Sequence, residues 1–89
     1  MKIAKNIITT DKAPAAMGPY SQAVATGKLV FTAGQSPLDP ANGQLVTGDI
    51  EEHTHRVLQN VQALLQEARS SLAMVIKTTV FMTDLANFN

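Results

Sequence analysis

One helical stripe constrains this fold more than any other feature of the sequence. Between residues 50 and 68, hydrophobic side chains recur at spacings of three and four, as on one face of an amphipathic helix. The stripe consists of Ile50, Thr54, Val57, Leu58, Val61, Leu64, Leu65 and Ala68. Asp49 is a favourable N-cap, and Glu52 three residues later completes a capping box. We therefore expect one long helix that begins at Ile50 and ends near residues 69–71.

The segments before the helix favour β-structure. Residues 3–9 predict a first strand, and residues 20–34 predict a hairpin that turns at residues 26–28. The segment between them contains two prolines and a glycine and is therefore expected to be irregular. A second loop, between the hairpin and the helix, contains Asn42-Gly43, which is a strong turn signal.

The segment after the helix predicts a fourth strand. Residues 76–83 alternate between two sets of side chains and are rich in β-branched residues. The order is therefore three strands, a long helix and a fourth strand, within the one domain that 89 residues allow. One helix covers only one face of a sheet, so the opposite face would expose Phe81 or Met82. We expect a second subunit to cover that face.

Composition disfavours several classes of protein. Seven basic and seven acidic residues give a net charge of zero, which disfavours a nucleic acid partner because phosphate binding needs a basic surface. The chain has no cysteine for a disulfide or a thiolate, which suits a reducing cytoplasm. Its apolar runs are too short for a signal peptide or a membrane span. We expect a cytoplasmic protein without a membrane partner.

Two sets of residues resemble metal-binding or catalytic groups, but their spacing favours ordinary roles. His53 and His55 are two residues apart, so on a helix they lie about 200° apart around the axis and cannot share one ion. They are expected on the solvated surface of the helix. Lys77 would need burial to act as a Schiff-base lysine, and a lysine that protects a sheet edge is the favoured interpretation.

Tyr20 and Gly34 are stronger candidates. Tyr20 is the only tyrosine and follows Gly18-Pro19, a pair that restricts the chain and so fixes where the phenol points. Gly34 ends the third predicted strand, where the absence of a Cβ lets a ligand approach the backbone N–H. For these residues taken alone, a packing tyrosine and a strand-end glycine are the simpler interpretation.

The motifs, taken in their order, resemble one family. The segments DKAPAAMGPYSQAV, LVFTAGQSPLDPANGQLV, LQNVQALLQEA and VIKTTVFMTDL follow one another at the spacing of the RidA/YjgF family of reactive-intermediate deaminases. The resemblance covers essentially the whole chain, and the motifs together are highly specific. It implies a chorismate-mutase-like α+β fold with a sheet on a long helix, here in the incomplete order strand-strand-strand-helix-strand.

The resemblance also implies an assembly and an activity. It implies a homotrimer with sites between subunits, which hydrolyses 2-imino or enamine acids to 2-keto acids and ammonia without a metal or cofactor. By this resemblance Tyr20 is the catalytic residue that faces substrate or water. Gly34 offers its backbone N–H, and Ala33 and Gln35 belong to the same substrate-binding segment. The family's other labels, translation initiation inhibitor and endoribonuclease, gain little support from the neutral charge.

Three features depart from the family pattern. Ala33 replaces the usual serine before Gly34. Arg69 replaces the glycine that follows the long helix, where a left-handed residue is expected. The 89 residues are also expected to form a single domain without the family's second helix and last strands. In the family, that part carries an arginine for the substrate carboxylate and a glutamate for the water.

These features leave three hypotheses open. The first is an imine deaminase that works as a trimer. The second is a non-catalytic protein of the same fold that binds small keto acids or partner proteins as a sensor or chaperone. Ala33 and the arginine missing from residues 1–89 favour this second hypothesis. The third is a shortened chain with a compromised fold, which a sharp unfolding transition of a defined oligomer would exclude.

Overall fold

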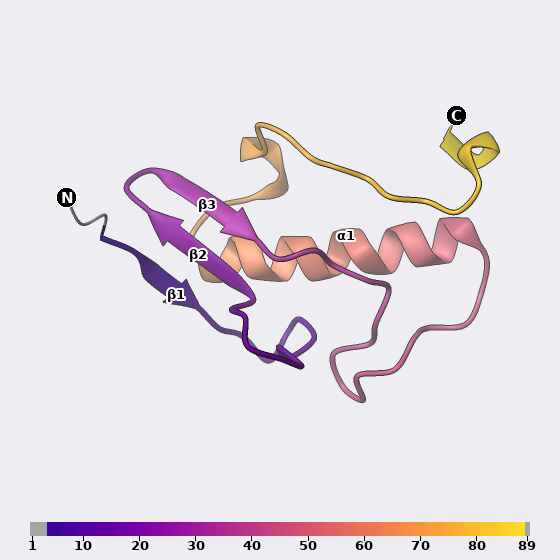
Figure 1. The fold of residues 1–89 in the computed structure, drawn as a ribbon, viewed down its shortest axis with the longest axis horizontal. Helices are drawn as coiled ribbons and strands as arrows, with labels where there is room; N and C mark the ends of the chain where they lie inside the picture. Colours follow the sequence, from indigo (N-terminus) through magenta and orange to yellow (C-terminus); the bar gives the residue numbers. More distant parts are fainter. Residues whose placement is uncertain (1–3, 89) are drawn as a thin grey trace.

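The computed structural model describes residues 4–88 and places a three-stranded antiparallel sheet against one long helix (Figure 1). The strands lie in the order β1-β2-β3 and the single α-helix follows them in the chain, which confirms the α+β class. The elements are β1 (Asn6–Ile8), β2 (Ala23–Thr26), β3 (Leu29–Thr32), α1 (Ile50–Glu67) and the short 3-10 helices η1 (Leu72–Met74) and η2 (Leu85–Phe88).

The hairpin forms where the sequence predicts it. A two-residue turn, Gly27-Lys28, joins β2 to β3, and Gly27 has a φ of 55°, which a residue with a Cβ adopts only at a cost. The predicted turn in the following loop is also present, since Gly43 has a φ of 70° and donates from its N–H to the Asp39 carbonyl over 2.7 Å. Local turn chemistry therefore sets both reversals of the chain.

Helix α1 is capped at both ends. The Asp49 carboxylate accepts a hydrogen bond from the Glu52 N–H over 3.1 Å, as the capping-box pattern predicts. At the other end Ser70 donates to the Leu65 carbonyl and Arg69 to the Gln66 carbonyl, which is the Schellman arrangement. Arg69 occupies the left-handed position of this motif with a φ of 62°. An arginine therefore stands where glycine is strongly preferred.

The core between sheet and helix is small. Its buried side chains are Ala13, Ala23 and Leu64, with Ile8 and Ala63 packed around them. The other face of the sheet is open, because Ile7 on β1 and Phe31 on β3 are 63% and 60% exposed. Both are register partners of Val24 on β2 and therefore share one face. In the single chain this face of β3 is therefore uncovered, although Leu29, Val30 and Phe31 form a continuous apolar run. Within residues 4–88, no helix is long and apolar enough to cross a membrane.

The predicted fourth strand is not formed. The segment of residues 75–84 runs back beside α1 toward its first turn (Figure 1), and the sheet of the described residues contains only three strands. A β-ladder requires a neighbouring strand for its N–H and C=O groups, and local β-propensity cannot supply one. Phe81 in this segment is 93% exposed, so the apolar exposure expected after the helix is present. Lys77 is likewise exposed, in an extended segment and not on a sheet edge.

Replacement of Arg69 by glycine is expected to stabilise the fold. The change relieves the left-handed strain of a residue with a Cβ and should raise the free energy of unfolding by about 1 kcal/mol. For a domain of this size that corresponds to about 4–8 °C in Tm, measured by circular dichroism. Arg69→Ala, which keeps a Cβ, is the matched control and should bring no such gain. An equal gain in both variants would contradict the assignment of the effect to backbone strain.

Candidate functional site

Tyr20 lies on a tight turn just before β2. Its backbone N–H donates to the Gly18 carbonyl over 2.8 Å, and its ring lies 3.7 Å from where a Cβ on Gly18 would be. The phenol oxygen accepts a hydrogen bond from the Met17 N–H at 3.2 Å, so the direction of the side chain is set by its own turn. Tyr20 is nevertheless 53% exposed, which leaves its O–H free to donate outward.

The turn that carries Tyr20 is held to the sheet by Gln22. The side chain of Gln22 is only 4% exposed, and its Oε1 accepts from the Thr10 N–H at 2.8 Å. Its Nε2 donates to the carbonyls of Thr10, Ala13 and Pro14 at 3.0, 3.3 and 2.8 Å. Each of these groups would cost about 1–3 kcal/mol if it were buried without a partner. One amide therefore fixes the irregular segment that the prolines create.

Gly34 lies in open space immediately after β3. A Cβ added there would meet no atom within 4 Å, and its φ is not positive. Among residues 4–88 we find no hydrogen bond from the Gly34 N–H. Neither backbone conformation nor packing within the chain therefore requires a glycine at this position. A group from outside the chain that approaches this N–H closely would require one.

Ala33 and Gln35 flank Gly34 and hold it at the end of the hairpin. The Ala33 N–H donates to the Gln22 carbonyl at 2.9 Å, which extends the β2–β3 pairing by one residue. The Gln35 side chain donates from Nε2 to the Ala33 carbonyl at 3.2 Å. Because Gln22 follows Tyr20 by two residues and Ala33 precedes Gly34, the chain enters and leaves the hairpin with Tyr20 and Gly34 at the same end.

The pocket beside Tyr20 does not extend to Gly34. A pocket of about 350 Å³ beside Tyr20 is lined by the segment before β2, including Thr9, Thr10, Asp11 and Ser21, and Gly34 is not among its lining residues. Both candidates thus lie at one end of the sheet, and of the two only Tyr20 lines this pocket.

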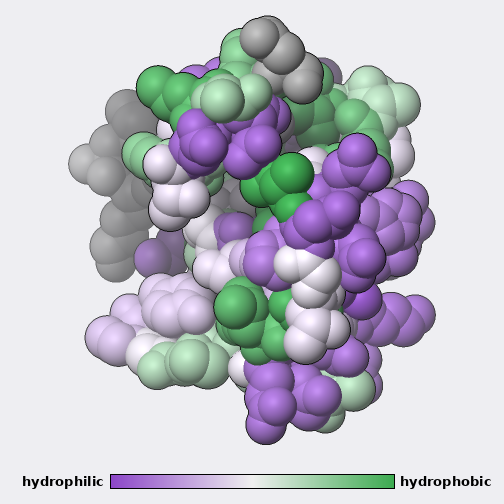
Figure 2. Space-filling view, turned by 90° about the vertical axis from the view of Figure 1, so that its right-hand side faces the viewer, coloured by the Kyte–Doolittle hydropathy of each residue, from purple (hydrophilic) through white to green (hydrophobic). Residues whose placement is uncertain are grey.

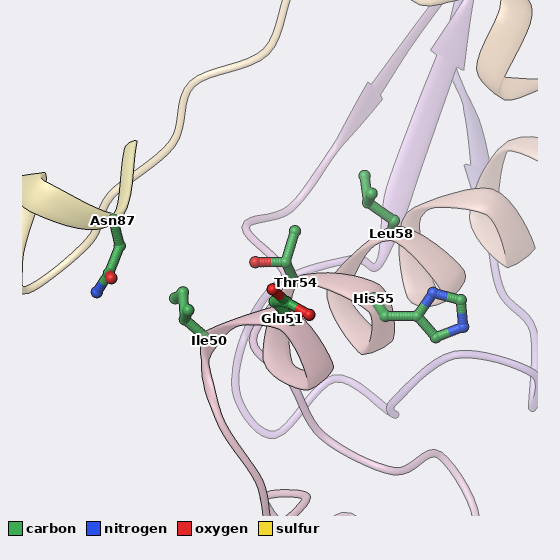
Figure 3. Close-up of a pocket in the computed structure, with 6 residues that line it drawn as sticks. All are labelled: Ile50, Glu51, Thr54, His55, Leu58 and Asn87. Atoms are coloured by element: carbon green, nitrogen blue, oxygen red, sulfur yellow. The ribbon is translucent and has the colours of Figure 1, made fainter. Parts of the chain in front are cut away.

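A second pocket lies between the first turns of α1 and the C-terminal segment. It measures about 340 Å³ and is lined by Ile50, Glu51, Thr54, His55, Leu58 and Asn87. Figure 3 shows Asn87 across from Ile50, on the segment that returns past α1. Neither Tyr20 nor Gly34 lines this pocket. Figure 2 shows how hydrophobic side chains reach the molecular surface between hydrophilic ones.

The two histidines have different environments. His55 is exposed, as expected for a solvated helix surface. His53 is half-buried, and its Nε2 lies 3.0 Å from the Val46 carbonyl, so it joins α1 to the preceding loop and is not simply solvated. Among residues 4–88, no group of three or more potential metal ligands comes together.

Asn60 is a buried polar residue that was not predicted from the sequence. It lies on α1 with none of its surface exposed, three residues after Val57 and four before Leu64. A signal was available, because this spacing puts an amide in the middle of the hydrophobic stripe. Arg56, four residues before Asn60 on α1, donates to the Asn60 Oδ1 from both Nε and Nη2, at 3.2 and 2.9 Å. The Glu52 carboxylate lies against Gly48 at the helix start.

Comparisons with known sequences agree on one family. A family model described as "Endoribonuclease L-PSP" matches residues 10–89. A RutC family protein of Pyrococcus abyssi is 51% identical over 86 residues, which are 97% of this chain and 68% of the relative. The 2-iminobutanoate/2-iminopropanoate deaminase of Homo sapiens is 41% identical over 85 residues, which are 96% of this chain and 62% of the relative.

Solved structures of the same fold give the same result. A putative endoribonuclease from Thermotoga maritima is 51% identical and superposes with a TM-score of 0.91. The match covers 99% of this chain and 67% of the Thermotoga chain. TdcF of E. coli with bound serine is 43% identical and superposes with a TM-score of 0.88. The match covers 93% of this chain and 65% of the TdcF chain. The chain thus spans about two thirds of the length of these relatives.

The likeness in fold and sequence defines a small α+β protein with a three-stranded antiparallel sheet and one long helix. The chain belongs to the RidA/YjgF family.

Proposed function

We propose that this chain, assembled with copies of itself, hydrolyses 2-imino acids to 2-keto acids and ammonia. The observation that carries the proposal is the open backbone N–H of Gly34, which lies at the same end of the hairpin as the Tyr20 phenol. A related human protein is named for this reaction, with 2-iminobutanoate and 2-iminopropanoate as its substrates.

The reaction needs a proton donor for the water or the departing nitrogen, and a hydrogen-bond donor that orients the substrate. Water adds to C2 of the C=N bond, a proton moves to the nitrogen, and the C–N bond then breaks to leave ammonia and a C=O group. The Tyr20 hydroxyl, which already accepts from Met17, is free to donate to the water or the departing nitrogen. The Gly34 N–H donates to the substrate and fixes its orientation. By family resemblance an arginine binds the substrate carboxylate, and we assign this role to none of residues 1–89.

We further propose that the assembly is a homotrimer and that the open face of the sheet lies inside it. Ile7 and Phe31 are exposed on that face, and contiguous apolar surface of this kind marks an interaction site. The trimer should place the site between subunits, because the hairpin end that carries Tyr20 and Gly34 belongs to the same strands.

The trimer can be tested by light scattering coupled to size exclusion. The wild type should have a molar mass three times that of one chain. Phe31→Asp puts a charge on the proposed interface and should lower the measured mass to that of a single chain. Gln62→Asp, on the exposed side of α1, is the control and should stay trimeric. A monomeric wild type, or a Phe31→Asp variant that remains a trimer, would contradict the assembly.

The activity can be tested with 2-iminobutanoate generated in situ by a threonine dehydratase. The wild type should accelerate 2-ketobutyrate release, and Tyr20→Phe should lower kcat by about 10²-fold because it removes the proton donor. Gly34→Ala keeps the backbone N–H, but its Cβ should keep the substrate away from it and lower kcat/KM by about ten- to a hundredfold, the loss expected for one hydrogen bond to a charged group, with an unchanged Tm. Thr32→Ala on the adjoining strand is the matched control and should keep full activity.

The same experiment distinguishes the non-catalytic alternative. The related TdcF of E. coli holds a bound serine, which supports the alternative that this fold binds small amino acids or related acids. If the wild type binds 2-ketobutyrate by calorimetry but does not accelerate its release, the chain is a small-acid-binding protein. Full activity in Tyr20→Phe would refute the role of the phenol.

A further inference from the structure

The loop that follows Gly34 is attached to α1 by one buried amide. Both hydrogens of the Asn60 Nδ2 are donated, one to the Ser36 carbonyl at 3.2 Å and one to the Leu38 carbonyl at 2.9 Å. The Oδ1 of the same side chain accepts both hydrogen bonds from Arg56. Every donor of this amide is therefore used, in a position without any solvent exposure.

The contacts of Asn60 are specific to a carboxamide. The two carbonyls of the loop need donors, and the Arg56 guanidinium needs an acceptor. An aspartate has the same shape and would satisfy Arg56, but as a carboxylate it offers no hydrogen to Ser36 or Leu38. A leucine would fill the volume and satisfy neither side. The guanidinium also holds the amide in one orientation, since it occupies the oxygen.

The segment with Gly34 is thereby held at two points. The Ala33 N–H bonds to the Gln22 carbonyl on the upstream side, and Asn60 holds Ser36 and Leu38 on the downstream side. Only Gly34 and Gln35 lie between these points. An N–H that orients a substrate must stay within a fraction of an ångström of its place, because a misplacement of about 1 Å can cost about 10²-fold in rate.

We propose that Asn60, oriented by Arg56, is a positioning residue that sets the direction of the Gly34 N–H toward the substrate. The inference rests on the proposed function for its effect on catalysis, but the position of the Gly34 amide is a property of the free protein. Asn60 touches no substrate and acts through the loop alone.

The test compares Asn60→Asp with Val61→Ala, the next residue on α1. Val61 is half-buried and does not hydrogen-bond to the loop through its side chain, so its truncation lowers stability without releasing Ser36 or Leu38. Two readouts are measured in each variant: the ¹H–¹⁵N resonance and hydrogen exchange of the Gly34 and Gln35 amides without ligand, and kcat and KM with 2-iminobutanoate.

Asn60→Asp should move both amide resonances, speed their exchange and lower kcat/KM by about tenfold or more. Val61→Ala should change Tm only. Unchanged Gly34 and Gln35 amides in folded Asn60→Asp would overturn the proposal, as would an equal loss of kcat/KM in Val61→Ala. If Asn60→Asp does not fold, Arg56→Met is measured, since it frees the Asn60 oxygen and should move the same amides by a smaller amount. Unchanged amides in that variant would likewise overturn it.

The two proposals fail in different ways. A wild type without deaminase activity refutes the proposed reaction, while the amide resonances still decide whether Asn60 positions Gly34. An active wild type with unchanged amides in the Asn60 variant refutes the positioning role alone.

Discussion

The geometry of this protein depends most on the hydrogen bonds of one buried side chain, the Gln22 amide. The apolar core is small, since its buried cluster consists of Ala13, Ala23 and Leu64, and Ala13 is the one residue that the irregular segment before β2 contributes to it. Gln22 instead bonds to Thr10, Ala13 and Pro14 and closes that segment against the sheet. Its own carbonyl accepts from Ala33, so the same residue connects the turn of Tyr20 to the segment of Gly34. In the same way Asn60 joins α1 to the loop after Gly34, through its hydrogen bonds to the Ser36 and Leu38 carbonyls.

Uncovered apolar surface links the fold to its proposed assembly. One helix covers one face of the sheet, and the outer face keeps Ile7, Leu29 and Phe31 exposed. The extended segment after η1 exposes Ile76 and Phe81 in the same way. A thin domain gains stability when copies of it bury such surface against each other. If the site and the interface share strands in this way, the pocket of one chain need not include both candidates, and the pocket beside Tyr20 does not include Gly34.

The features predicted correctly from the sequence are those that depend on local interactions. The cap at Asp49 and the turn at Gly27 each follow from neighbouring residues, whereas the left-handed position of Arg69 was expected from the family resemblance. The fourth strand fails because β-propensity does not provide a partner strand. The buried amides are missed because burial of a polar residue depends on contacts far along the chain. Tyr20 and Gly34 could be singled out by backbone constraint, but their roles came only from the family resemblance.

The most direct test of the proposed site is to observe the Gly34 amide by NMR while 2-ketobutyrate, the proposed product, is added to the ¹⁵N-labelled wild-type chain. We predict a saturable shift of the Gly34 resonance, with the Tyr20 amide shifting at the same ligand concentrations. If the ligand binds and shifts other residues while Gly34 and Tyr20 do not respond, the end of the hairpin is not the site. The proposed roles of both residues in imine hydrolysis would then be wrong.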